Sequence, residues 1–377
     1  MSDTGLQLRS LITEDAVLKI GLKAAPIPEP AADEIVIKME AAPLNPSDMA
    51  LLTLHADLST GRTTGSGADT VFTADIPAHL MNSVTARIGK SLPVGNEGSG
   101  TVVRAGSGDA AQALLGKIVA VVGGAMFCQY RLMKAVQALP MRDGISAKQG
   151  ASCFVNPMTA LAMTEVMASE GFSGLVHTAA ASNLGQMLNR VCQKDGISLV
   201  NVVRREEQEA LLRGMGAEYV VNSSSDNFRA ELAAAISETE AYMCFDAIGG
   251  GGIVDDVLAA MEGAATKGQG SIGPYGSDVF KQIYVYGGLS QEPTTLQRSY
   301  GFNWGVAGWL TTPSMVKLGG AKVQAMRRRV ASEIDSTFAS SYQEEVSLSG
   351  ALQVDHIARY ARQSTGKKYL INPSLDL

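Results

Sequence analysis

The chain has 377 residues, of which 46% are hydrophobic and 18% charged, and its formal net charge at pH 7 is −6. A single hydrophobic core stops growing at roughly 250 residues, so this length predicts two domains. The acidic balance argues against nucleic-acid binding, and the apolar runs are far shorter than the ~20 residues that span a bilayer. The N-terminal residues fit neither a secretory signal nor a transit peptide, so we expect a cytoplasmic protein.

Short alternating segments separated by glycines make up residues 33 to 140. In "DEIVIKME", Ile35, Ile37 and Met39 alternate with polar neighbours, which is the period of a half-buried strand. We expect an all-β region here, in the form of a small barrel. The stretch 56–92 is rich in Thr, Ser and Gly, lacks clear periodicity and is too long for an ordinary connection. It is interpreted as an insertion or a lid near the ligand of the first domain.

After residue 150 the pattern changes to strands that alternate with single helices. "GLVHTAA" predicts a buried strand, and Leu184, Met187, Leu188 and Val191 then recur at helical spacing. The further strands are "SLVNVV", "AEYVVN", "AYMCFDAIGG" and "FKQIYVYGG", each followed or preceded by a helical pattern. This alternation predicts a doubly wound parallel sheet of the α/β class. "GKKYLINP" near the C-terminus predicts a final strand that rejoins the first domain.

The turn after "GLVH" is the candidate phosphate site. Of the fingerprint G-x-G-x-x-G, only Gly185 remains. The small residues before it still let a phosphate approach the backbone, Asn183 tolerates the left-handed conformation, and the free amides at a helix N-terminus attract an anion whatever the sequence. An ordinary strand-to-helix turn is the alternative. The residues assigned here to cofactor binding are Ala181, Ser182, Asn183, Leu184 and Gly185.

Two arginines, Arg204 and Arg205, follow the next strand, about 20 residues further on. An acidic residue at this place would bind the ribose of NAD, whereas a guanidinium fork suits the 2′-phosphate of NADP. The alternative is a solvated helix start in which the arginines pair with the acids of 206–209. We therefore predict NADPH as the cofactor.

Several motifs, taken together, resemble the medium-chain dehydrogenase/reductase superfamily, in particular its zinc-independent branch of quinone oxidoreductases and enoyl-thioester reductases. They occur in the family's order and cover nearly the whole chain. The resemblance implies a GroES-like β-barrel domain (1–150 and 300–377), a Rossmann domain (151–299), and a nicotinamide in the cleft between them. The motifs include "AAPLNPSD" (41–48), "LPVGNEGSGTVV" (92–103), "NPMTA" (156–160), "AAASNLGQ" (179–186), "NVVRR" (201–205), "FDAIGG" (245–250), "YGGLS" (286–290) and "STGKKYLI" (364–371).

The same resemblance implies roles for individual residues. Asn45 and Asp48 would sit beside the nicotinamide, and Thr159 would pack under its ring. Phe302 and Trp304 are similar to the aromatic pair that enoyl reductases of this branch place over cofactor and substrate. The alternatives are structural, with the polar residues as turn formers and the aromatic residues as core. The backbone around Gly287 to Leu289 would hold the carboxamide, and the other cofactor contacts implied are Gly249, Tyr286, Gly287, Gly288 and Lys367.

This chain departs from the family pattern at the positions of the zinc ligands and of the proton donor. Zinc-dependent members have Cys where Asn45 stands and His where Asn96 stands, and an amide is a poor zinc ligand. The four cysteines are scattered singly, so we expect no metal. Enoyl reductases carry a proton-donating tyrosine about eight residues after the "NPSD" motif, where this chain has Ala56. The donor is left open between His55 and a residue of the stretch 56–92.

These observations predict an NADPH-dependent oxidoreductase that transfers hydride to a quinone or another conjugated carbonyl without zinc. Such chemistry depends on positioning and on stabilisation of a developing oxyanion more than on a dedicated acid. One alternative is an enoyl-thioester reductase, which needs a placed proton donor. Another is a protein that binds NADPH without turnover. We expect a small-molecule substrate and a homodimer, with no nucleic acid or membrane as a partner.

Overall fold

The computed structural model describes residues 4–53, 55–268, 273–362 and 368–376. The chain forms two compact units, Met1–Val155 with Arg327–Leu377 and Asn156–Met326, so the first unit contains both ends of the chain. We expected the second boundary at residue 300, and this is wrong. Residues 304–308 form a strand of the second unit's sheet and hold the following segment in that unit.

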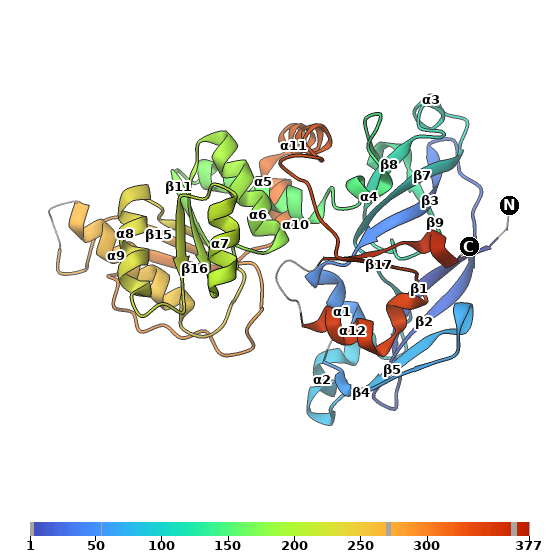
Figure 1. Ribbon diagram of the computed structural model, residues 1–377, viewed down its shortest axis with the longest axis horizontal. Coiled ribbons are helices and arrows are strands. Elements are labelled where there is room, and N and C mark those ends of the chain that lie inside the picture. Colours follow the sequence, from blue (N-terminus) through green and yellow to red (C-terminus); the bar gives the residue numbers. More distant parts are fainter. Residues whose placement is uncertain (1–3, 54, 269–272, 363–367, 377) are drawn as a thin grey trace. The chain divides into compact units, whose positions relative to one another are not determined.

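The first unit is mainly antiparallel β-structure arranged in two sheets (Figure 1). One sheet has the order β4-β5-β2-β1-β6, and the other has the order β10-β8-β7-β3-β18-β17, with β9 also paired to β3. The last strand, β18, pairs with β3, which confirms that the C-terminal segment rejoins the first domain. The strands are β1 (Thr4–Ile12), β2 (Val17–Pro26), β3 (Glu34–Pro43), β4 (Asp57–Thr64), β5 (Val71–Asp75), β6 (Leu92–Pro93), β7 (Glu97–Ala105), β8 (Ile118–Val122), β9 (Tyr130–Lys134), β10 (Leu139–Pro140), β17 (Glu344–Val346) and β18 (Tyr369–Ile371). The short helices are α1 (Met49–Leu52), α2 (Met81–Val84), α3 (Asp109–Gln112), α4 (Ala147–Gly150) and α12 (Val354–Ala361).

The stretch 56–92, which we interpreted as an insertion or lid, forms a regular part of this unit. Strands β4 and β5 make an antiparallel pair, and β5 also pairs with β2, so the stretch extends a sheet. Phe72 of β5 is buried in the core, and Thr63 of β4 donates a hydrogen bond from Oγ1 to the Leu352 carbonyl at 2.6 Å. The interpretation of a lid is therefore wrong.

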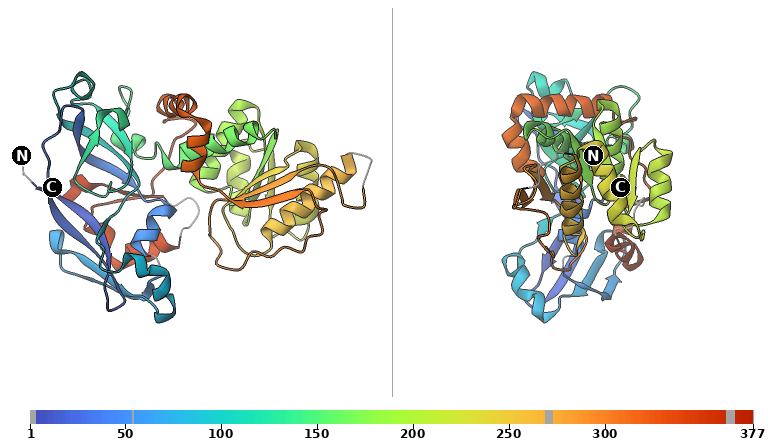
Figure 2. Two further views of the ribbon diagram at one scale, coloured as in Figure 1. Left: turned by 180° about the vertical axis from the view of Figure 1, so that it is seen from behind. Right: turned by 90° about the vertical axis from the view of Figure 1, so that its left-hand side faces the viewer.

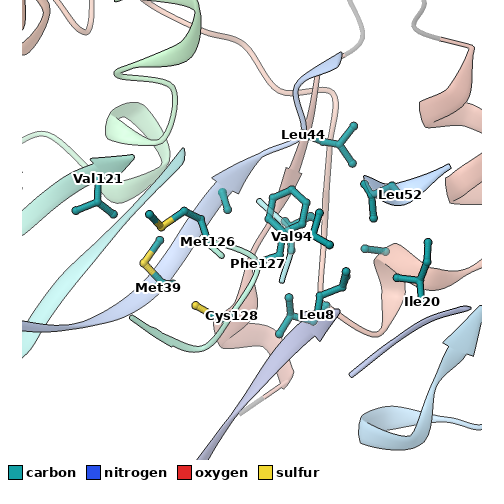
Figure 3. Packing of buried hydrophobic residues seen from close by; sticks show 14 of the residues in the cluster. Leu8, Ile20, Met39, Leu44, Leu52, Val94, Val121, Met126, Phe127 and Cys128 are labelled. Atoms are coloured by element: carbon teal, nitrogen blue, oxygen red, sulfur yellow. The ribbon is translucent and has the colours of Figure 1, made fainter. Parts of the chain in front are cut away.

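Both sheets of the first unit contribute to one hydrophobic core. Figure 3 shows Leu8, Met39, Val94 and Phe127 among the side chains packed there. Gly95 has a φ of +100°, and a Cβ atom at this position would lie 2.6 Å from the Phe127 ring. The glycine therefore permits the close packing beside the "NEGSG" strand, which carries part of the candidate site.

The second unit contains a parallel sheet with the strand order β13-β12-β11-β14-β15-β16 and helices on both of its faces (Figure 2). This confirms the predicted doubly wound sheet. No helix among the described residues is long and apolar enough to cross a membrane. The strands are β11 (Gly174–His177), β12 (Ser198–Val203), β13 (Tyr219–Asn222), β14 (Met243–Asp246), β15 (Lys281–Val285) and β16 (Trp304–Gly308). The helices are α5 (Val155–Ser169), α6 (Asn183–Asp195), α7 (Glu206–Gly214), α8 (Phe228–Thr239), α9 (Ile253–Gly268), α10 (Thr311–Leu318) and α11 (Gly320–Ser332), of which α5 begins and α11 ends in the first unit.

Parallel pairing places the carboxyl ends of all these strands at one edge of the sheet. The strand order reverses between β11 and β14, and open α/β sheets bind ligands at the carboxyl ends beside such a reversal. The loops after β11, β12, β14 and β15 are therefore the part of the second unit in which to look for a cofactor site.

Candidate functional site

The turn between β11 and α6 presents a helix N-terminus at the carboxyl edge. Ser182 caps the helix, because its Oγ accepts a hydrogen bond from the Gly185 amide at 3.1 Å. A Cβ atom on Gly185 would lie 2.1 Å from the Ala180 carbonyl oxygen, so the helix can approach the turn this closely only with glycine. Gly185 thus has the packing role of the third glycine of the fingerprint.

The other residues of the turn are small or face inward. Ala181 and Leu184 are buried, and Asn183 is the first residue of α6. The left-handed residue is Ala179, with a φ of +50°, and not Asn183 as expected. The structure therefore forms the turn with an alanine where a glycine would fit more easily.

Arg204 and Arg205 directly follow the carboxyl end of β12, and both are exposed. Their backbone amides donate to Gln208 Oε1 at 3.0 and 3.2 Å, which fixes the start of α7. Ser224, in the loop after β13, donates from Oγ to the Arg204 carbonyl at 2.9 Å. The two guanidinium groups thus project from an ordered loop at the same edge as the phosphate turn.

Gly249 and Gly287 lie against each other after β14 and β15. Gly249 has a φ of +77°, and a Cβ atom there would be 2.6 Å from the Gly287 carbonyl oxygen. A Cβ atom on Gly287 would be 2.5 Å from the Ala247 carbonyl oxygen. The Asp246 carboxylate accepts the Gly249 amide at 2.8 Å and the Thr178 hydroxyl at 2.6 Å, which joins the two loops to β11. The loops are therefore rigidly placed.

A contact between the buried His177 and the half-buried Tyr286 supports the segment that precedes Gly287. His177 Nε2 and the Tyr286 hydroxyl are 2.7 Å apart, and the two rings stack. Burial lowers the pKa of His177 to about 3, so the imidazole is neutral, and burial raises the pKa of Tyr286 above its usual range. Sequence analysis did not find this pair, because no pattern links two residues 109 positions apart.

The predicted aromatic pair lies at the opposite edge of the sheet. Trp304 is the first residue of β16 and pairs with Lys281, the first residue of β15. Phe302 is 81% exposed and contacts Tyr275. At about 3.3 Å per strand residue, these aromatic side chains start roughly 13 Å from the carboxyl ends. They therefore lie away from the carboxyl edge, where the other residues assigned to the cofactor in this unit are found.

An aromatic residue that sequence analysis missed lies at the correct edge. Trp309 directly follows β16 and is buried. Its ring packs edge-on against Phe245 at 5.0 Å and against Tyr286 at 6.4 Å, measured between ring centroids. In the sequence, Trp309 stands at the end of the segment that forms β16, whereas Phe302 and Trp304 stand at its start.

Thr159 lies on α5 and is buried. Its hydroxyl is 3.0 Å from that of Thr311, the first residue of α10. Since α10 begins two residues after Trp309, this contact brings Thr159 toward the carboxyl edge of the sheet. Gly288 is exposed beside Gly287, and Lys367 lies outside the described residues.

A buried polar network in the first unit contains both Asn45 and Asp48. The Asn45 amide donates from its backbone N to Asp48 Oδ2 at 2.8 Å and from Nδ2 to Glu97 Oε1 at 3.0 Å. Glu97 Oε2 accepts the backbone amides of Phe154 and Val155 at 2.8 and 2.9 Å. Asn45 thus links the turn after β3 to Glu97 through its Nδ2 atom, while its buried Oδ1 accepts no hydrogen bond among the described residues. The described residues contain no group of three His, Cys, Asp or Glu that could hold a metal ion.

Lys368, which sequence analysis missed, faces this network. It is buried, and its Nζ donates to Ser152 Oγ at 2.7 Å. Burial lowers the pKa of Lys368 to about 8, against the attraction of Glu97 and Asp48. Burial also raises the pKa of Asp48 to about 7. His55, in contrast, is exposed and has a φ of +59°, and it contributes no bond to the network.

We predict that Gly185→Ala destabilises the protein. The added methyl group would press against the Ala180 carbonyl, and overpacking of this kind costs about 1–3 kcal/mol. Gly214→Ala is the matched control, because Gly214 is also helical and a Cβ atom there meets nothing within 4 Å. Denaturant unfolding followed by circular dichroism measures both. An equal effect of the two substitutions would contradict the packing role of Gly185.

We predict that Asp48 makes the stability depend on pH. Its pKa in the folded protein, about 7, lies above the ordinary value of 3.8, so the folded state keeps a proton that the unfolded chain loses. The free energy of unfolding should therefore fall as the pH rises from 4 to 7, on the order of 1–3 kcal/mol for this group. In Asp48→Asn this part of the fall should be absent. Denaturant unfolding at pH 5 and pH 7.5 tests this prediction. An equal fall in the free energy of unfolding in the parent and in the variant would refute it.

Comparison with known proteins supports the same fold. No protein-family model matches the chain. Over 229 residues it is 27% identical to the mitochondrial enoyl-[acyl-carrier-protein] reductase of Xenopus tropicalis, covering 58% of this chain and 57% of that protein. The match thus spans little more than half of that relative's length.

Two solved structures cover nearly the whole chain. A candidate NADPH:quinone reductase from Mesorhizobium loti superposes with a TM-score of 0.72 at 21% identity, over 99% of both chains. A mycobacterial protein solved in complex with NADPH superposes with a TM-score of 0.64 at 16% identity, over 98% of this chain and 100% of that one. These comparisons show that the chain has the fold of these solved reductases, a GroES-like domain with a Rossmann domain.

Proposed function

We propose that the protein is an NADPH-dependent oxidoreductase that transfers hydride to a quinone or another conjugated carbonyl without zinc. The observation that carries the proposal is the carboxyl edge of the second unit's sheet. There the capped turn before Gly185, the exposed Arg204 and Arg205, and the packed loops of Gly249 and Gly287 follow neighbouring strands. A relative named for NADPH:quinone reduction and another solved with NADPH share this fold.

The residues at this edge fit a dinucleotide. The amides at the start of α6 would hold the pyrophosphate, and the close contact at Gly185 keeps the helix end near it. Arg204 and Arg205 would bind the 2′-phosphate. A Cβ atom on Gly288 would meet nothing within 4 Å, so the backbone there is open to a ligand, as a carboxamide site requires. When bound, the nicotinamide would supply the hydride.

The chain's residues would orient the cofactor and leave protonation to solvent. Thr159, beside Thr311, would support the nicotinamide, and the Tyr286–Gly287 backbone would fix its carboxamide. The reduced oxygens of a quinone can take protons from water, so this reaction does not need the tyrosine that is replaced by Ala56. The enoyl-thioester reductase is kept as a second candidate, because the curated relative is an enoyl reductase.

A substrate panel tests the proposed reaction. We expect NADPH oxidation to be faster with quinones or enones than with a crotonyl thioester, and to persist in chelator. His55→Ala should leave quinone turnover within a few-fold of the parent, because His55 is exposed and outside the buried network. A loss of the ~10² or more expected for a general acid, with an enoyl thioester as the fastest substrate, would assign the protein to the enoyl reductases. Absence of turnover on the whole panel would favour the alternative of a protein that binds NADPH without catalysing a reaction.

A second prediction concerns cofactor choice. NADPH should bind at least tenfold more tightly than NADH, since a charge-assisted contact to phosphate is worth ~1.5–3 kcal/mol. The combined change Arg204→Ala and Arg205→Ala should abolish this ratio and leave NADH binding unchanged. Arg229→Ala is the control, because Arg229 lies on the surface and pairs with Asp256. Calorimetric titration measures the affinity for each cofactor. An unchanged ratio of the two affinities in the double variant would refute the assignment of Arg204 and Arg205 to the 2′-phosphate.

We further propose a homodimer formed by the edge strand β16. Within the described residues, β16 is paired on one side only, and its sequence WGVAG has no charged residue to protect the free edge. Two copies could pair across a two-fold axis and continue the sheet. Ala307→Glu, which places like charges near that axis, should give monomers in light scattering, whereas Val316→Glu on α10 should not. A monomeric parent would refute the proposal.

A further inference from the structure

A groove of about 830 Å³ lies between helices α5 and α10 of the second unit. Its floor is formed by the ends of β15 and β16 and by the loop residues that follow them, including Gly287, Gly288 and Gly308. One wall is the last turn of α5 with Val166 and Ser169. The other wall is the segment 313–318 of α10.

The sequence explains why this space stays open. The hydroxyl contact between Thr159 and Thr311 joins α5 and α10 near their N-termini, whereas the groove lies between their later residues. The three glycines have no side chains that could fill the floor. Only Ser314 of α10 is buried, so most of this helix does not pack closely on the sheet.

The lining of the groove is mainly apolar. It includes Val166, Trp309, Leu310 and Leu318, and Leu310 is 70% exposed. The Glu170 carboxylate is engaged by the Tyr284 hydroxyl at 2.8 and 3.0 Å, so its charge is partly satisfied within the wall. Lys317 of α10 also lines the groove, but most of the lining surface is apolar. Such a surface favours a hydrocarbon ligand over a sugar or a phosphate.

The groove begins at the segment to which we assign the nicotinamide carboxamide. Gly287 and Gly288 line it, and Tyr286 and Trp309 lie at the same end. We propose that the groove binds the alkyl side chain of the substrate, so that the natural substrate is a quinone or related conjugated carbonyl with a long apolar tail. This inference rests on the proposed function and specifies its substrate class. A pocket of this size accommodates much more than a single ring.

The test compares benzoquinone carrying a decyl side chain with the same ring lacking it. The parent should show a KM at least tenfold lower for the decyl compound, since each buried methylene favours binding roughly fourfold. Ser169→Trp, which fills the groove from the α5 wall, should remove this advantage and leave turnover of the bare ring within twofold. Ala168→Trp is the control, because Ala168 is an exposed neighbour on the same helix outside the groove.

Equal KM values for the two quinones in the parent, or the same behaviour of Ser169→Trp and Ala168→Trp, would overturn the inference. If the protein reduces no quinone, the proposed function fails, and calorimetric binding of the decyl quinone decides on the groove alone. Binding by the parent and Ala168→Trp that is at least tenfold weaker in Ser169→Trp would support the groove. Equal binding by all three proteins, or none by the parent, would refute it.

Discussion

The polar interior of the first unit depends on the hydrogen bonds that the buried Glu97 carboxylate accepts. The carboxylate accepts them from the Asn45 side chain and from the backbone amides of Phe154 and Val155. It therefore joins the turn after β3 to the segment that leads into α5, across positions far apart in the chain. Loss of this acceptor would remove the bonds of two buried donors, the Asn45 side chain and the Phe154 amide, each at a cost of about 1–3 kcal/mol. Lys368 places a positive charge near the same carboxylate.

In the second unit, the candidate phosphate site depends more on the N-terminus of α6 than on the glycines of the fingerprint. Gly185 is kept where a methyl group would collide with a carbonyl oxygen 2.1 Å away. At Ala179 the chain accepts a left-handed alanine, a conformation that costs about 1–2 kcal/mol relative to its usual region. The amides that would face a phosphate belong to the start of α6 and do not depend on the lost glycines. A degraded fingerprint can thus retain its geometry when the contact that requires glycine is preserved.

The sequence predicted the second unit well because its buried strands and amphipathic helices have strong periodicity. It failed at residue 300, because the segment 286–303 connects β15 to β16 without a helix and gives no pattern. It also failed for β4, whose Thr- and Ser-rich strand is largely solvent-facing. The pairs His177–Tyr286 and Lys368–Ser152 were out of reach, since each joins residues that only the tertiary fold brings together.

The misplaced aromatic pair shows how direction along a strand decides function. Phe302 precedes β16 and Trp304 begins it, whereas Trp309 follows it, so Trp309 lies at the opposite edge from the other two although only a few residues separate them. Every other group that we assign to the cofactor in this unit follows a strand or lies on a helix joined to that edge. Because the switch point of a parallel sheet lies at the carboxyl ends, an aromatic residue before a strand cannot stack on a nicotinamide there without leaving the sheet. Trp309, in contact with Tyr286, lies instead at the carboxyl edge, where the loops of Gly249 and Gly287 also lie.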